Sequence, residues 1–304
     1  MANEPQFSIL KKPGAAQPGV ALYAVVRNEM YFLPHFLQHY RALGIREFWF
    51  LDDRSGDGTR EFLRAQPDCG VIECNMSFGD MVGQMRLGPA SKTLIPRALL
   101  QGRWVLTVDA DEFLLLPRPF SNLNELVTAL GQHDLSAARA LMLDFYPACL
   151  RQLESATPQD SPFALCPNFD AYAVLDWPDR TPQPSAISQG DGVRARMLAH
   201  LHDIGLAQGD LFKSYKYPNV NKVPLLFWRE DTQMLSAHRS NVLPSDQIQL
   251  VLAHFKFYPG YRDRIADALL TNAYWQNSSE YRFLDIATRE LLDWPLTGPL
   301  TRPF

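Results

Sequence analysis

Short apolar runs that each end in a cluster of polar residues are the feature that most constrains the fold of this chain. The runs are residues 20–26, followed by Arg27-Asn28-Glu29; residues 48–51, followed by Asp52-Asp53; and residues 104–108, followed by Asp109-Ala110-Asp111-Glu112. Short runs rich in β-branched and aromatic residues are typical of strands buried on both faces. A helical periodicity over residues 33–40 separates the first two runs. Strand, helix and strand at this spacing predict an α/β domain with a mostly parallel sheet.

The polar clusters all follow predicted strand ends. Ligands of parallel α/β sheets bind at the carboxyl ends of the strands, so we expect the clusters to meet in one crevice. Carboxylates with apolar flanks are costly to bury unless they are paired or bound to a cation. In an extended backbone Asp109 and Asp111 would face the same way and grip one ion, with Ala110 leaving room. The alternative is a strand followed by an acidic turn.

Composition and charge exclude several classes of protein. The formal net charge of −4 argues against a general nucleic-acid binder, whose affinity would come from a basic surface. The four cysteines lack the paired spacing of a zinc site and are too few for a disulfide scaffold, which favours a reducing compartment. The N-terminus lacks the apolar core of a signal peptide, and no run is long enough to span a bilayer. We expect a cytoplasmic protein; peripheral contact with the inner face of a membrane stays open.

The rest of the chain is less regular. Helices are predicted at residues 59–66, 91–100, 123–130, 262–272 and 281–292, and further strands at 71–74, 138–145, 222–228 and 250–258. Residues 146–189 hold seven prolines with little periodicity and are interpreted as an insertion-like loop region. No internal repeat and no clean boundary is visible, so we expect one elaborated domain.

Three motifs together resemble the family 2-like glycosyltransferases of the GT-A fold, and most closely a bacterial branch of them. They are Arg27-Asn28-Glu29, Asp52-Asp53-Arg54-Ser55-Gly56-Asp57-Gly58-Thr59 and Asp109-Ala110-Asp111-Glu112-Phe113. The strong part of the resemblance covers residues 20–117, and a weaker part covers residues 190–282.

The resemblance implies a Rossmann-like, mostly parallel central sheet flanked by helices, with a C-terminal β/α extension. It divides the chain into a lead-in at 1–19, a nucleotide-sugar-binding half at 20–145, the insertion-like region at 146–189, and an acceptor-side and C-terminal part at 190–304. The implied reaction is transfer of a sugar from a nucleotide-diphosphate sugar, foremost a UDP-sugar, to a hydroxyl, with inversion. The implied acceptor is a saccharide or lipid-linked molecule of bacterial surface polysaccharide or glycoconjugate synthesis.

The implied cofactor is Mn²⁺ or Mg²⁺ holding the donor diphosphate, since hard divalent ions favour carboxylate oxygens. Asp111 is the first candidate metal ligand, and Asp109 would bind the metal or the ribose. Glu112 either supports this site or begins the next strand. Asp52 and Asp53 would contact the uracil or ribose, the alternative being a turn and helix cap, which is the role we expect for Asp57.

Nucleotide contacts are also expected at the end of the first strand, from Arg27, Asn28 and Glu29, with capping as the alternative for Asn28. Arg27 or Lys92 would pair with phosphate, although an exposed lysine is more often solvent-facing.

Two histidines and a lysine complete the predicted ligand set. By the resemblance His254 completes the metal shell, against the ordinary interpretation of a core histidine in an apolar strand. Lys256, two residues on, would meet the diphosphate, and His238 has a weaker case as a ligand. The pair His200 and His202 has metal-like spacing, but we interpret its surroundings as a loop without a carboxylate partner.

An inverting transfer needs a general base to take the acceptor proton. Glu230 and Asp231 are the first candidates, and Asp144, at a predicted strand end, is the rival. Two other functions stay open: a nucleotidyltransferase or metal-dependent phosphohydrolase on a similar sheet, and a catalytically silent nucleotide-sugar-binding protein.

Overall fold

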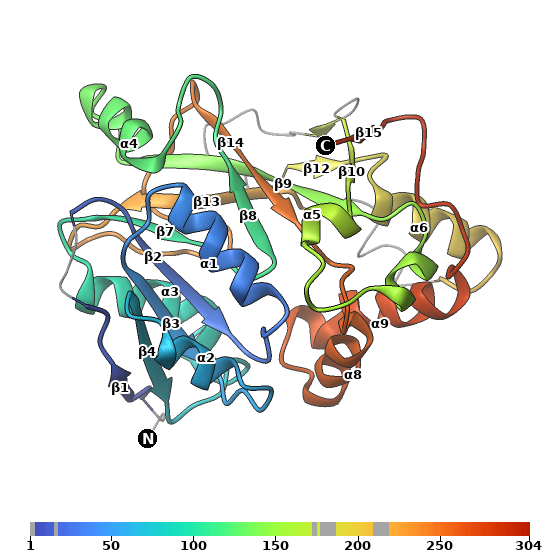
Figure 1. Ribbon diagram of the computed structural model, residues 1–304, viewed down its shortest axis with the longest axis horizontal. Coiled ribbons are helices and arrows are strands. Elements are labelled where there is room, and N and C mark those ends of the chain that lie inside the picture. Colours follow the sequence, from blue (N-terminus) through green and yellow to red (C-terminus); the bar gives the residue numbers. More distant parts are fainter. Residues whose placement is uncertain (1–3, 15–17, 172–174, 177–186, 209–218) are drawn as a thin grey trace. The chain divides into compact units, whose positions relative to one another are not determined.

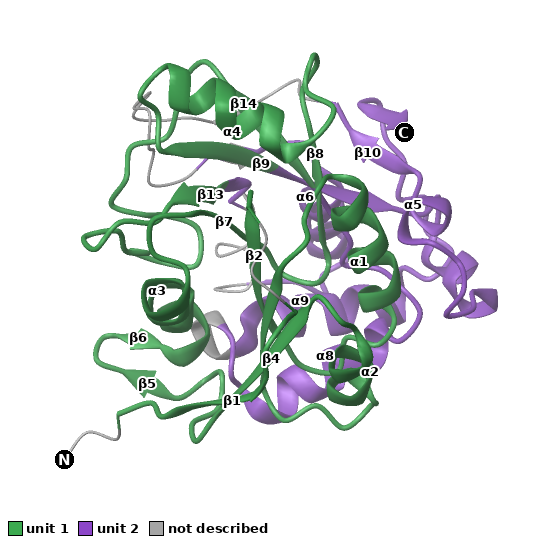
Figure 2. Ribbon diagram, turned by 60° about the vertical axis from the view of Figure 1, so that its left-hand side comes forward, with its two compact units in different colours: residues 1–141, 181–183, 222–252 green, residues 142–180, 184–221, 253–304 purple. Residues whose placement is uncertain are grey.

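The computed structural model describes residues 4–14, 18–171, 175–176, 187–208 and 219–304. The chain forms two compact units, coloured separately in Figure 2. Of the described residues, 4–141 and 222–252 belong to unit 1, and the others belong to unit 2. Strands β9 (Ala137–Tyr146) and β14 (Gln249–His254) each begin in unit 1 and end in unit 2.

Four parallel strands form the centre of the unit 1 sheet (Figure 1). In spatial order they are β4 (Cys69–Cys74), β3 (Phe48–Asp52), β2 (Ala21–Val26) and β7 (Trp104–Thr107). Two antiparallel strands flank them, because β1 (Phe7–Lys11) pairs with β4 and β13 (Asn221–Phe227) pairs with β7. The predicted α/β fold with a mostly parallel central sheet is confirmed. The predicted loose lead-in at 1–19 is wrong in part, since the free edge of β4 recruits β1.

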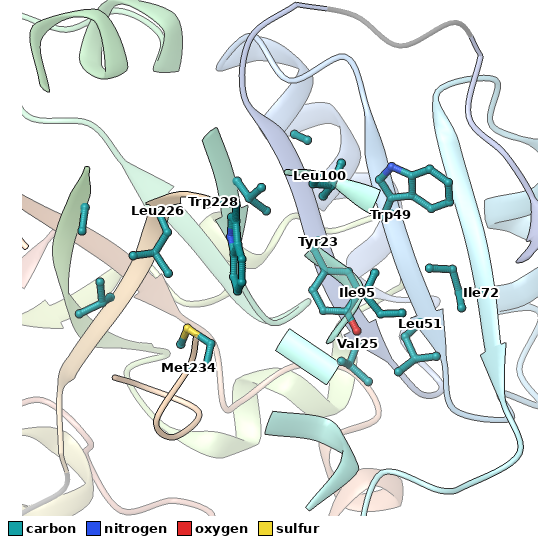
Figure 3. Packing of buried hydrophobic residues seen from close by; sticks show 14 residues of the cluster. Tyr23, Val25, Trp49, Leu51, Ile72, Ile95, Leu100, Leu226, Trp228 and Met234 are labelled. Carbon is teal, nitrogen blue, oxygen red and sulfur yellow. The ribbon is translucent and has the colours of Figure 1, made fainter. Parts of the chain in front are cut away.

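Helices cover both faces of this sheet, which explains why β2 and β3 are apolar and buried throughout. The even-numbered side chains of β3 point toward α1 (Phe32–Ala42), where the rings of Phe36 and Phe50 lie 6.2 Å apart. The odd-numbered side chains point toward α3 (Leu87–Leu99), where Trp49 and Leu51 share a core with Ile95 (Figure 3). If the same alternation continues past the end of β3, Asp52 points to the α1 face and Asp53 points to the α3 face.

The other elements of unit 1 are short. They are α2 (Thr59–Ala65), β5 (Met81–Val82), β6 (Met85–Arg86), β8 (Glu112–Leu115) and α4 (Leu123–Gln132). The hydroxyl of Tyr40, on α1, donates to the carbonyl of Glu112 at 2.8 Å, which fixes the start of β8 beneath α1.

Unit 2 contains most of the region predicted as an insertion-like loop, and its described residues include regular elements. They are a 3₁₀ helix (Leu150–Ser155), α5 (Pro162–Leu165), β10 (Asn168–Asp170), β11 (Leu175–Asp176), β12 (Ser188–Gln189), α6 (Val193–Asp203), α8 (Tyr261–Thr271), α9 (Trp275–Glu290) and β15 (Thr301–Pro303). Strand β10 pairs with both β9 and β15. Residues 177–186, which hold three of the seven prolines, lie outside the described residues.

The four cysteines are all described, and each is a free thiol. Within the described ranges no helix combines the length and apolar character needed to cross a bilayer.

Candidate functional site

The carboxyl ends of β2, β3 and β7 lie at one edge of the unit 1 sheet. Strand β2 is in the middle: its Val26 pairs with Asp52 of β3, and its Tyr23 pairs with Thr107 of β7. Because neighbouring strands are about 4.8 Å apart, the chain after β3 and the chain after β7 are separated by roughly 10 Å. The acidic clusters at Asp53 and Asp109 therefore flank the same strand end.

The two neighbouring aspartates after β3 have different environments because they point to opposite faces. Asp52 faces α2, where its carboxylate accepts a hydrogen bond from Arg60 Nε at 2.6 Å and is fully covered. Asp53 points to the α3 face and lines a shallow recess with Val25, Leu51 and Phe78 among others. We infer that Asp52 anchors α2, whereas Asp53 can contact a ligand.

The recess beside Asp53 has no room for a water-sized molecule, whereas typical ligand sites enclose ~300–1,000 Å³. The ring of Phe78 closes it by packing directly on Gly88, where an added Cβ would lie 2.1 Å from the ring. A larger residue at position 88 would displace the ring of Phe78, and entry of a ligand requires the same ring to move.

Burial raises the pKa of Asp53, and the N–H of Phe78 and the guanidinium of Arg27 offset only part of that rise. Arg27 Nη1 lies 3.7 Å from the Asp53 carboxylate and donates to the Asp53 carbonyl at 3.4 Å. An ionised Asp53 is thus incompletely compensated in the folded protein. Such groups are more frequent at functional sites than in structural cores.

We expect Asp53→Asn to raise the Tm at neutral pH. Because the folded pKa of Asp53 exceeds its unfolded value, ionisation costs stability as the pH rises through the folded pKa, and the cost is fully present above it. Asparagine avoids this cost, so the difference in Tm from wild type should vanish as the pH falls below the ordinary carboxyl pKa. Scanning calorimetry across pH measures this. A Tm below that of wild type at neutral pH would contradict the assignment.

Asn28 connects the loop after β2 to the loop after β3. It has a positive φ of 55°, its side-chain oxygen accepts from Gly56 N–H at 2.8 Å, and its own N–H donates to Ser55 Oγ at 3.0 Å. Asp57 accepts from the N–H groups of Thr59 and Met30, each at 3.0 Å, which confirms its expected capping role. Glu29, only 6% exposed, donates its backbone N–H to Thr59 Oγ1 at 2.9 Å. Through these contacts Asn28 and Glu29 hold the chain after β2 against the chain after β3.

The Asp109 segment is a turn, which corrects the prediction of an extended backbone. The N–H of Glu112 donates to the Asp109 carbonyl at 3.1 Å, and the N–H of Asp109 donates to the Glu112 carboxylate at 2.8 Å. Residues 109–112 therefore reverse direction between β7 and β8, and the side chains of Asp109 and Asp111 are not aligned by a strand.

Both oxygens of Asp109 are in contact with lysine ammonium groups. Lys92 Nζ, from α3, lies 2.7 Å from Oδ1, and Lys222 Nζ, from β13, lies 3.1 Å from Oδ2. Partial desolvation would raise the pKa of Asp109, but the two cations outweigh it and hold this pKa well below its usual range. Asp109 is therefore ionised at any physiological pH. Lys92, at 3% exposed, is not the solvent-facing lysine that its residue type suggested.

Glu112 begins β8 and shares Lys222 with Asp109, with its two oxygens 2.7 and 2.5 Å from Lys222 Nζ. Both roles considered for Glu112 therefore apply, since it begins a strand and also holds Lys222 beside Asp109. Asp111 lies between these residues in the turn and is half-buried.

The carboxylates of this turn do not form a metal cage by themselves. Asp109 already binds two ammonium groups, and Asp111, the next carboxylate of the turn, is half-buried. Over the described residues no group of three or more His, Cys, Asp or Glu side chains is arranged to hold a metal. Mg²⁺ and similar ions are commonly bound by one or two carboxylates together with substrate phosphates. The residues therefore fit a cation that arrives with a phosphate ligand, and do not fit a preformed cage.

Glu230 and Asp231 lie at the opposite edge of the sheet, which corrects their expected role beside Asp109. Strand β13 is antiparallel to β7, and its last residue, Phe227, pairs with Trp104 at the start of β7. Both acids follow in an exposed turn. About five residue steps of extended chain, roughly 17 Å, separate this end of β7 from Asp109.

His238 lies at the edge of the unit 1 sheet that also carries Asp109 and Lys222. Its carbonyl accepts the N–H of Val223 at 2.9 Å, which places its backbone beside the residue that follows Lys222.

In unit 2, Asp144 and His254 form a hydrogen-bonded pair. His254 Nδ1 lies 2.8 Å from one Asp144 oxygen, and Arg194 Nε donates to the other at 2.6 Å. Burial would raise the pKa of Asp144, but Arg194 and His254 hold it far below its ordinary value. A carboxylate held so firmly ionised is a poor proton acceptor, so this geometry favours Asp144 as a residue that orients His254.

The same network continues through Glu280, which accepts from Arg194 Nη1 at 2.6 Å and lies 4.0 Å from Lys256 Nζ. His200 and His202 lie on helix α6, so the predicted loop is wrong, and the ring of His200 stacks on Trp294 at 5.1 Å.

Lys222 is the site residue that the sequence did not identify. Extending the observed β13–β7 register by three residues places it opposite Asp109. In the sequence Lys222 is a single lysine at the start of an apolar run, 113 positions from Asp109. Its contact with Asp109 follows only from the register of the sheet.

Comparison with known proteins gives distant likenesses only. No family model matches the chain, and no curated protein matches it. Among solved structures it is similar to mannosyltransferase PcManGT from Pyrobaculum calidifontis, in complex with GDP-Man and Mn²⁺, at 22% identity over 44% of this chain and 40% of that chain, with a TM-score of 0.29. S. aureus TarS is 14% identical over 89% of this chain and 43% of that chain, with a TM-score of 0.34.

The UDP-glucose pyrophosphorylase from Acinetobacter baumanii is 10% identical over 89% of this chain and 99% of that chain, with a TM-score of 0.30. The chain spans less than half the length of PcManGT and of TarS. Likeness at this level establishes no shared family or activity.

Proposed function

We propose that this chain is a glycosyltransferase of GT-A type that uses a nucleotide-diphosphate sugar, foremost a UDP-sugar, together with Mn²⁺ or Mg²⁺. The observation that carries the proposal is the pair of acidic clusters at Asp53 and Asp109–Asp111, which flank the end of β2 at the carboxyl edge of a parallel sheet. This edge is where α/β sheets bind nucleotides.

The role that we propose for each side chain follows from its contacts. Asp53, in the apolar recess closed by Phe78, would accept hydrogen bonds from the base or ribose, and Phe78 would offer its ring to the base. Arg27, beside Asp53, would face the phosphates. Asp109, held ionised by two lysines, would accept a ribose hydroxyl.

Asp111 would hold the divalent cation with the diphosphate. Within unit 2, the contact of His254 with Asp144 is the one that orients a histidine for metal binding, and His254 stays a candidate ligand on that ground. Such a cation supplies charge neutralisation for the departing diphosphate. The acceptor we propose is a saccharide or lipid-linked hydroxyl of bacterial surface glycoconjugate synthesis. Its oxygen would attack the anomeric carbon of the donor sugar with inversion, the bond from that carbon to the nucleoside diphosphate would break, and a base would take the hydroxyl proton.

A thermal-shift screen of UDP-, GDP- and TDP-sugars, with and without Mn²⁺, tests this function. We expect one nucleotide class to raise the Tm with Mn²⁺ and to do so far less without it. A product assay then separates the alternatives: free nucleoside diphosphate indicates sugar transfer or donor hydrolysis, whereas pyrophosphate released from a nucleoside triphosphate would indicate a nucleotidyltransferase. No stabilisation by any nucleotide would contradict the proposal.

We expect Asp231→Ala to retain donor binding and at least half of wild-type transfer activity. Its side chain is exposed at the edge of the sheet opposite Asp109, so it cannot reach an acceptor bound near Asp111. Steady-state kinetics with the donor found in the screen measure this. A loss of kcat of about 100-fold, typical of removing a general base, would return the base to this turn.

A further inference from the structure

The Lys222 ammonium group occupies the position in which a carboxylate site would hold a cation. Three carboxylate oxygens surround its Nζ, one from Asp109 at 3.1 Å and two from Glu112 at 2.7 and 2.5 Å. Divalent ions are bound by such oxygens at about 2.0–2.6 Å, so a small contraction of this cluster would suit Mn²⁺ or Mg²⁺.

The cluster is built into the fold and does not depend on surface side chains. Lys222 is 1% exposed and Glu112 is 2% exposed. Lys222 comes from β13, Asp109 and Glu112 come from the turn between β7 and β8, and Lys92 reaches the other oxygen of Asp109 from α3. Three separate elements thus hold the charges in place.

The printed ion pairs of this cluster join two carboxylates to two lysines. Asp109 and Glu112 contribute two negative charges, and Lys92 and Lys222 contribute two positive ones. Without Lys222 the buried Glu112 would lose its cation, and burying an unpaired charge is strongly unfavourable. A bound divalent ion would supply the missing positive charge.

We propose that Lys222 is a built-in counter-ion that fills a latent divalent-cation site between Asp109 and Glu112. While the lysine is present, the chain binds no divalent ion at these two carboxylates. Removing the lysine converts them into a cation site.

The test is binding of Mn²⁺ alone to Lys222→Met, a substitution close in length that lacks the charge. We expect Lys222→Met to bind Mn²⁺ at least 10-fold more tightly than wild type, measured by the loss of the free Mn²⁺ signal in electron paramagnetic resonance. Mn²⁺ should also raise its Tm more than that of wild type. Lys12→Met, which removes the same charge from an exposed side chain, should behave as wild type.

The double variant Lys222→Met/Glu112→Gln locates the site. It lacks the buried charge that needs a partner, so it should fold without metal and lose the gain in Mn²⁺ affinity. If Lys222→Met folds only when Mn²⁺ is present, that rescue supports the proposal. Three results would overturn it: wild-type Mn²⁺ affinity in Lys222→Met, equal Mn²⁺ affinity in the single and double variants, or a single variant that Mn²⁺ cannot rescue.

These measurements contain no nucleotide, so they are independent of the proposed function. A failed nucleotide-sugar screen would leave the latent site intact, and wild-type Mn²⁺ affinity in Lys222→Met would leave the transferase intact.

Discussion

Asp111→Ala should abolish Mn²⁺-dependent stabilisation by the donor while leaving the fold intact. In the proposed function Asp111 is the carboxylate of this turn that holds the cation, whereas Asp109 and Glu112 contact lysines. Its loss should weaken Mn²⁺-dependent donor binding roughly 100-fold, or about 2.7 kcal/mol, and lower transfer activity at least as much. Calorimetric titration of the donor with and without Mn²⁺ measures the effect.

The matched control is Asp231→Ala, which removes an exposed aspartate from a turn at the other edge of the same sheet. It should bind donor and Mn²⁺ as wild type does. Unchanged Mn²⁺ dependence in Asp111→Ala would remove Asp111 from the site.

Arg194→Met should destabilise unit 2 strongly. Arg194 is 7% exposed and is the shared partner of Asp144 and Glu280. Removing one member of a buried ion-pair network leaves uncompensated charge and costs roughly 3–5 kcal/mol. In a chain of this size that corresponds to a fall in Tm of roughly 10 °C, which scanning calorimetry detects.

Arg151→Met is the matched control, because Arg151 also bridges two acids, Glu154 and Asp293, but is 52% exposed. Exposed ion pairs contribute about 0–1 kcal/mol, so its Tm should change little. Equal effects of the two substitutions would show that the Arg194 network is not a structural support of unit 2.

The central sheet could be predicted from the sequence because each strand carries a local signal. Residues 20–26 and 48–51 are apolar throughout and are bounded by helical periodicity, so both strands and α1 follow from short-range pattern. The polar ends of these strands predicted the edge at which the acidic residues lie. Edge strand β1 was missed because its pairing with β4 is a long-range event.

The candidate site could be predicted only in part, because its electrostatics depend on strand register. Asp52 and Asp53 are chemically identical in the sequence, but the β pleat directs one to Arg60 and the other into the recess. Glu230 and Asp231 resembled a catalytic pair, but the antiparallel direction of β13 carries them away from Asp109 and brings Lys222 to it.

The most direct test of the central claim is anomalous diffraction from crystals grown with Mn²⁺ and the nucleoside diphosphate selected by the screen. We predict one manganese peak beside Asp111 that contacts the diphosphate, with the ribose near Asp109 and the base near Asp53. Nucleotide bound away from the carboxyl ends of β2, β3 and β7, or manganese bound without contact to Asp111, would contradict the account.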